Sequence, residues 1–115
     1  MKLYKASEKE WIRGKGYAKR PLITSSELGI EGSFIQEVSF NRGDIVPLHH
    51  HAQQTEVFYA IDEAWFEING KNVVMQPGDI VMCEPGDVHG NPEIPHDFKI
   101  LVLKIGYKEN DTFWD

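Results

Sequence analysis

The chain has 115 residues and a formal net charge of −6. This length accommodates one hydrophobic core and leaves little room for a second domain. With 41% hydrophobic and 26% charged residues, the composition is that of a globular protein and excludes a wholly disordered chain. Apolar runs stay well short of the ~20 residues that a membrane-spanning helix needs, so no spanning segment is expected.

The charged residues and the single cysteine indicate the cellular location of the protein and the macromolecules that it binds. The N-terminal residues, beginning Met1-Lys2-Leu3, include no apolar stretch typical of a signal peptide. The single cysteine, Cys83, excludes an intramolecular disulfide and fits a reducing cytoplasm. Residues 1–20 contain seven Lys or Arg and two Glu, but the basic residues are scattered and the whole chain is acidic. We therefore expect a cytoplasmic protein that binds neither nucleic acid nor membranes.

Short runs of β-type residues, separated by turn residues, extend through the chain. Asn69-Gly70 favours a tight hairpin because both positions tolerate positive φ, and Pro-Gly-Asp occurs twice, at 77–79 and 85–87. Pro21 restricts the first predicted strand to a sheet edge. No apolar pattern of period 3.6 persists for three turns, so the spacing predicts an all-β sandwich or barrel. The expected strands are residues 17–24, 34–40, 45–51, 56–61, 64–68, 73–75, 80–83, 88–89 and 97–105.

Four residues, His49, His51, Glu56 and His89, are candidate metal ligands. His49 and His51 are two positions apart, so in a strand their imidazoles share one face while His50 points the other way. In the same straight strand the Glu56 side chain would point to the face opposite His49 and His51. Residues 52–55 must therefore turn or bulge to direct Glu56 toward the two histidines. His89 would arrive from another strand. Considered alone, three consecutive histidines are more often a polar loop than a metal site.

Two segments resemble the paired motifs of the cupin superfamily. The first motif, G-x5-H-x-H followed by E and G, matches Gly43, His49, His51 and Glu56, but Glu63 stands at the final glycine position. The second motif, G-x5-P-x-G-x2-H-x3-N, matches at three further positions, Gly78, Gly86 and His89, with Glu84 in place of the proline and Glu93 in place of the asparagine. The departures affect turn positions and leave all four candidate ligands intact.

The resemblance implies an all-β fold of the double-stranded β-helix or jelly-roll type. It implies one cupin domain over residues 1–115, with an N-terminal arm and edge strand at 1–24, a barrel at 25–106 and a tail at 107–115. His49, His51, Glu56 and His89 would hold one divalent transition metal ion. The ligand types alone leave Fe, Mn, Ni, Co, Cu and Zn open. Small cupins often pair, so the resemblance also implies a homodimer, for which strand 17–24 is the candidate contact.

In a barrel, alternate strand positions line the cavity. Phe58 and Ala60 share the inward side with Glu56, and four residues are candidates for contact with a small-molecule ligand: Gln36, Gln54, Phe58 and Trp65. The aromatic tail at 112–115 is expected to pack over the barrel or a dimer partner, or to cover the metal. No cluster of Arg or Lys forms a phosphate clamp, which favours a neutral or mono-anionic substrate such as a sugar, uronate or keto acid.

The resemblance favours a metal-dependent enzyme that isomerises or tautomerises a small polar molecule. No dedicated general base stands out beyond the ligand set, so the catalytic residues are unknown at this point. An iron-dependent dioxygenase is one alternative. A module that binds a metal or sugar without catalysis is the other.

Overall fold

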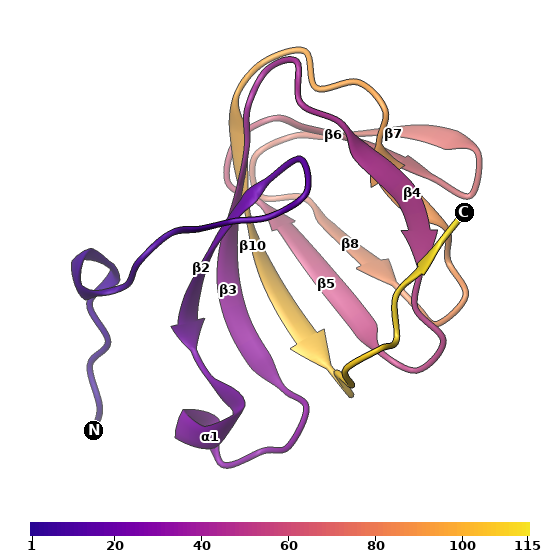
Figure 1. Ribbon diagram of the computed structural model, residues 1–115. Helices are drawn as coiled ribbons and strands as arrows, with labels where there is room; N and C mark the ends of the chain where they lie inside the picture. Colours follow the sequence, from indigo (N-terminus) through magenta and orange to yellow (C-terminus); the bar gives the residue numbers. More distant parts are fainter.

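The computed structural model describes residues 1–115 as two facing antiparallel sheets (Figure 1). Helical structure is confined to a 3-10 turn at Ala6–Glu8 and the short helix α1 at Ser25–Leu28. No helix is long or apolar enough to cross a membrane. The strands are β1 Ile12–Arg13, β2 Ala18–Ile23, β3 Phe34–Phe40, β4 Val46–His50, β5 Thr55–Ala60, β6 Ala64–Ile68, β7 Lys71–Met75, β8 Ile80–Cys83, β9 His89–Asn91, β10 Phe98–Ile105 and β11 Phe113–Trp114.

The two sheets have the strand orders β1-β2-β3-β10-β5-β8 and β11-β4-β9-β6-β7. Between β3 and β10 the chain crosses to the opposite sheet at every connection except the β6–β7 hairpin. Sequence-distant strands therefore become neighbours, as β3 and β10 do over seven paired positions. This topology confirms the predicted all-β jelly roll.

The structure corrects the predicted position of the first strand. β2 does not form the sheet edge, because the two-residue strand β1 pairs with its first residues, Ala18 and Lys19. Pro21 lies beyond the segment that β1 covers, where a missing N–H is tolerated. Sequence analysis also missed β11 and α1, which have two and four residues. Elements this short carry no detectable periodicity.

Inward-facing aromatic side chains form the centre of the core. Phe98, 1% exposed, stacks on Phe40 at 4.7 Å between ring centroids, and Phe58 stacks on Phe66 at 5.2 Å. Alternation along each strand places them all inside, since successive side chains point to opposite faces. All four rings belong to one core cluster between the two sheets.

Two Pro-Gly-Asp turns repeat the same geometry on either side of β8. Gly78 and Gly86 have φ of 93° and 91°, which a residue with a side chain rarely adopts. Asp79 and Asp87 each accept a hydrogen bond from the backbone N–H three residues earlier, both at 2.8 Å. The second turn leads directly into β9, so it sets where His89 enters the barrel.

Candidate metal centre

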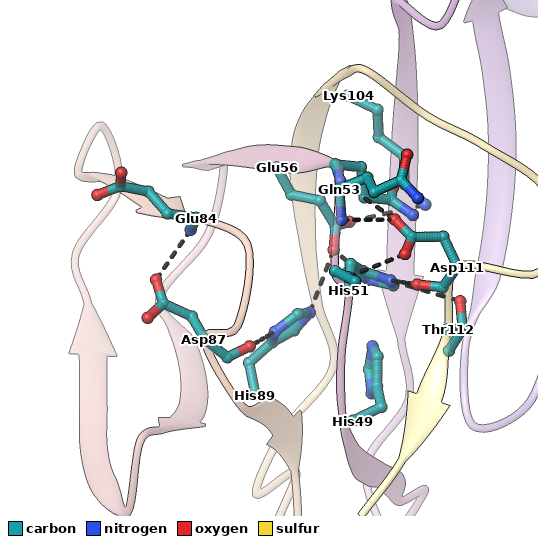
Figure 2. Close-up of polar contacts among 12 residues, drawn as sticks. His49, His51, Gln53, Glu56, Glu84, Asp87, His89, Lys104, Asp111 and Thr112 are labelled. Atoms are coloured by element: carbon teal, nitrogen blue, oxygen red, sulfur yellow. Dashed lines mark hydrogen bonds and ion pairs between the residues drawn. The ribbon is translucent and has the colours of Figure 1, made fainter.

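Three histidines converge inside the barrel (Figure 2). His49 lies on β4, His51 directly follows that strand, and His89 begins β9, where it pairs with His49. One ring nitrogen from each lies within 4.8 Å of the others. His51 and His89 are 6% and 4% exposed. The structure thus brings together residues that are 38 positions apart along the chain.

Backbone carbonyls fix the orientation of all three rings. Nδ1 of His49 lies 2.8 Å from the Pro47 carbonyl oxygen, and Nδ1 of His89 lies 2.9 Å from that of Asp87. The third contact joins Nδ1 of His51 to the Asp111 carbonyl oxygen at 2.9 Å. A carbonyl can only accept, so each Nδ1 carries a proton, and the neutral form of each ring has its lone pair on Nε2. This is the tautomer that metal ligation through Nε2 requires.

Glu56 completes the cluster from β5. Its Oε1 lies 2.8 Å from Nε2 of His51 and 3.1 Å from Nε2 of His89. If both Nε2 atoms carried lone pairs, each lone pair would be repelled by the carboxylate oxygen unless positive charge lay between them. Protons or a cation can supply that charge. Three imidazoles and one carboxylate are a donor set that suits a divalent transition metal, so the residues fit such an ion.

Burial and neighbouring groups shift the pKa values of two candidate ligands, His49 and Glu56. Burial disfavours the imidazolium form and, with the nearby His89 and His51, lowers the pKa of His49 to about 4. Burial alone would raise the pKa of Glu56. Contacts with His51 and His89 and the charge of Lys104 outweigh that effect and hold the pKa of Glu56 below its ordinary value. At neutral pH the site therefore offers a neutral His49 imidazole and an ionised carboxylate.

Asp111 shapes the turn that brings Glu56 into the site. Its carboxylate accepts hydrogen bonds from three consecutive backbone N–H groups, those of Ala52, Gln53 and Gln54, at 2.9–3.1 Å. Burial alone would raise the pKa of Asp111, but these hydrogen bonds lower it. The turn directs the Glu56 side chain toward the histidines, as the sequence required. Sequence reasoning missed Asp111 because its partners lie 57–59 residues away.

A cavity of about 180 Å³ adjoins the cluster. Gln36 and Phe58 line it, as predicted. Trp65 lies outside it, because Ala64 and Phe66 occupy the inward positions of β6 and the indole instead donates to Glu63 at 2.9 Å. Gln54 is 2% exposed but is likewise not a lining residue. Polar or aromatic lining residues that sequence analysis did not propose are Tyr17, Phe40, Phe66, Asn91 and Lys104. Thr112 and Trp114 line the cavity from the C-terminal tail, one of the positions expected for it.

The C-terminal tail packs on the barrel and also lines the cavity. β11 pairs with β4 so that Trp114 lies opposite His49, with their ring centroids 4.9 Å apart. His50 points away from the cavity, as its parity predicts: Nδ1 contacts Asp115 at 2.8 Å, and the ring stacks on Phe113. The tail thus covers both faces of the histidine strand.

The departures from the family motifs leave the local backbone unstrained. Glu63 is not among the residues with positive φ, so its position does not need a glycine. Glu84 begins the second Pro-Gly-Asp turn, whose proline and glycine are Pro85 and Gly86, and its backbone N–H donates to Asp87. Neither glutamate lines the cavity.

Comparison with known proteins agrees with this architecture. The family described as Cupin domain matches residues 36–102. No curated protein matches the sequence. Among solved structures, a Streptomyces Pac13 variant with uridine superposes with a TM-score of 0.78 at 14% identity, over 100% of this chain and 90% of that chain. Pac13 is described as a nucleoside dehydratase.

Two further structures are similar over nearly the whole chain. Ectoine synthase from P. lautus has a TM-score of 0.79 at 16% identity, covering 100% of this chain and 90% of that chain. KdgF from Halomonas sp. has a TM-score of 0.76 at 18% identity, covering 96% and 97%. At these identities the likeness shows the fold alone.

Proposed function

Because this chain belongs to the cupin family, we propose that it is a metal-dependent enzyme acting on a small polar molecule. The observation that carries the proposal is the convergence of three imidazole Nε2 atoms and the Glu56 carboxylate beside a cavity. The cavity, about 180 Å³, is smaller than the roughly 300–1,000 Å³ of pockets for drug-sized ligands. A small metabolite suits that volume.

His49, His51, Glu56 and His89 would hold one divalent ion, and Fe, Mn, Ni, Co, Cu and Zn all accept this donor set. When bound, the metal would act as a Lewis acid toward a carbonyl or hydroxyl of the substrate. The backbone contacts at Nδ1 orient the three rings before any ion binds. Such preorganisation raises metal affinity.

The reaction that we propose is isomerisation or tautomerisation of a sugar or keto acid. Such chemistry places negative charge on a substrate oxygen, and hydrogen-bond donors aimed at that oxygen stabilise it. Burial raises the pKa of Tyr17, so its phenol stays protonated at neutral pH and is available as a donor in the cavity. Val38, Phe40 and Ile100 supply an apolar wall that keeps bulk water from the reacting atoms.

Similar structures support catalysis on a small molecule. Two of them are described as enzymes, a nucleoside dehydratase and an ectoine synthase, and a Pac13 variant was solved with uridine. These ligands and activities belong to those proteins. They support the proposal that this chain also catalyses a reaction of a small molecule in its cavity.

The test begins with the metal content of tag-free protein, measured by plasma mass spectrometry. We expect about one equivalent of a transition metal, its loss in His51→Ala and its retention in His50→Ala. Proton NMR in D2O then follows sugars, uronates and keto acids. An isomerase exchanges the C–H hydrogen next to the carbonyl with solvent, and His51→Ala abolishes that exchange.

Other outcomes would replace the proposed reaction. Iron in the protein together with substrate-dependent oxygen uptake would indicate the dioxygenase alternative. A bound metal with neither exchange nor oxygen uptake would indicate a non-catalytic binding module. Absence of metal after reconstitution would contradict the whole proposal.

Dimerisation and cellular location belong to the same proposal. Apolar side chains on the outer face of the six-stranded sheet form neighbouring cross-strand pairs: exposed Tyr59 lies opposite exposed Ile80, and half-buried Val57 lies opposite exposed Met82. We expect a homodimer through this face, with β2, the strand proposed from the sequence, as the other candidate contact. Burial raises the pKa of Cys83 to about 12, so its thiol is unreactive, as suits the predicted cytoplasmic location.

A further inference from the structure

The inward face of the six-stranded sheet changes from apolar to polar toward one end. Lys104 on β10 lies directly opposite Glu56 on β5, and both line the cavity. Gln36 on β3 pairs with Val102, two residues before Lys104. Diagonal cross-strand neighbours are about 7–8 Å apart, within reach of long side chains. The Gln36 amide and the Lys104 ammonium can therefore contact the same small group.

The Lys104 ammonium lines the cavity, paired loosely with Glu56 and flanked by two aromatic rings. Its side chain is 16% exposed, and Nζ lies 3.7 Å from Oε2 of Glu56, too far for a good hydrogen bond. The rings of Phe34 and Tyr107 flank Nζ, with centroids 5.8 and 5.4 Å away. None of the hydrogen bonds within the chain engages this ammonium. Its N–H donors are therefore free to bind a ligand in the cavity.

Gln36 is a second polar side chain without a partner. The residue is 6% exposed, lines the cavity and makes no side-chain hydrogen bond within the chain. An amide that faces a cavity and has no partner within the chain is free to hydrogen-bond a ligand there. Its NH2 group offers donors beside the Lys104 ammonium.

The charges lining the cavity favour an anion. Glu56 is the only carboxylate and Lys104 the only Lys or Arg among the lining residues. Glu56 also faces the histidines through Oε1, so a divalent ion at the proposed site would leave the cavity with an excess of positive charge. An anionic substrate would offset that excess.

We propose that Lys104 and Gln36 form the binding site for a carboxylate group of the substrate, which is therefore a small mono-anionic carboxylic acid. This inference rests on the proposed function and narrows its substrate class. One ammonium and one amide match the two oxygens of a carboxylate. A phosphate group carries up to two charges and is usually held by several cationic groups. Lys104 lies beside Glu56, on the side away from His49 and His89 (Figure 2).

The probe for this site is trifluoroacetate, with trifluoroethanol as its neutral counterpart. Binding is measured by fluorine NMR titration of zinc-loaded and metal-stripped protein. We expect millimolar binding of trifluoroacetate that weakens about tenfold in Lys104→Met, the effect of losing a charge-assisted hydrogen bond. A smaller loss is expected in Gln36→Leu. Lys104→Arg should retain binding, which separates the loss of charge from a folding defect.

Lys99→Met is the matched control, because Lys99 is an exposed lysine on the same strand. It should bind trifluoroacetate as the wild type does. Equal binding by the wild type and Lys104→Met, no binding by the wild type, or equal binding of trifluoroethanol would each overturn the inference. Loss of zinc from Lys104→Met would also overturn it, because Lys104 would then act by supporting Glu56. Failure of the wild type to take up zinc, with Lys104-dependent trifluoroacetate binding intact, would overturn only the proposed metal chemistry.

Discussion

The backbone carbonyl oxygen of Asp111 lies 2.9 Å from Nδ1 of His51, although 60 residues separate them. The carboxylate of the same residue holds the turn between His51 and Glu56 through three backbone N–H groups. One residue in the C-terminal tail therefore orients one candidate ligand and positions another (Figure 2).

Asp111→Asn should weaken metal binding without removing a ligand. An amide presents N–H donors where the turn needs an acceptor, so the turn loosens and Glu56 loses its fixed position. We expect metal affinity to fall about tenfold, within the 10–100-fold range of outer contacts, and the Tm to fall by several degrees. Competition with a chelating dye measures the affinity, and differential scanning calorimetry measures the Tm.

Asp115→Asn provides the control in the same tail. Asp115 contacts His50, which faces away from the cavity. This variant should bind metal with wild-type affinity. Equal weakening by both substitutions would show that the tail acts only by packing, and the role assigned to Asp111 would be wrong.

Substitutions along the histidine strand should alternate in their effect. His49→Ala and His89→Ala each remove a proposed ligand and should reduce metal affinity by more than the roughly 100-fold upper limit of an outer contact. His50→Ala should change it by less than about threefold, since that ring stacks on Phe113 outside the cavity. Isothermal titration with Zn²⁺ measures all three. Similar losses in all three variants would contradict the assigned ligand set.

The sequence predicted the central strands and the four candidate ligands because local patterns encode both. Alternation defined Phe34–Phe40 and Ala64–Ile68, whose observed bounds match the predicted ones. The roles of Asp111 and Tyr17 depend on contacts between distant segments, which no local pattern reveals. Lys104 could have been identified, because it is in phase with the buried residues Phe98, Ile100 and Val102. Trp65 was proposed from its chemistry, but its neighbours Ala64 and Phe66 occupy the inward positions.

Core packing should make Phe98→Ala strongly destabilising. Phe98 is 1% exposed and stacks on Phe40, so truncation leaves a cavity that the two sheets cannot close. The expected loss in the free energy of unfolding is about 3–5 kcal/mol, measured by urea denaturation. Ile30→Ala, at a residue 58% exposed, should change it by less than about 0.5 kcal/mol. A small effect at Phe98 would mean that this part of the core is loosely packed.

The turn before His89 should contribute a pH-dependent share of stability. Hydrogen bonds from Asn69 and from the backbone N–H of Glu84 lower the pKa of Asp87. A carboxylate whose pKa is lowered by folding stabilises the folded state above its unfolded pKa of about 3.9, and this contribution is lost as the pH falls through the lower folded value. Asp87→Asn should therefore be less stable than the wild type at pH 6 and approach it toward pH 3. Urea midpoints across this range test the sign, and a constant difference would contradict it.

The outer face of β5 and β8 should mediate dimerisation. Met82 and Ile80 are 55% and 63% exposed, and their cross-strand partners on β5 are Val57 and Tyr59. β8 is the last strand of its sheet, so this apolar surface extends to the sheet edge. Met82→Glu places a charge in the middle of the apolar surface and should convert a dimer to a monomer in sedimentation velocity at micromolar concentration. Val74→Glu makes the same change at a residue 46% exposed on the other sheet and should leave the dimer intact. Dissociation by Val74→Glu and not by Met82→Glu would move the interface to the five-stranded sheet.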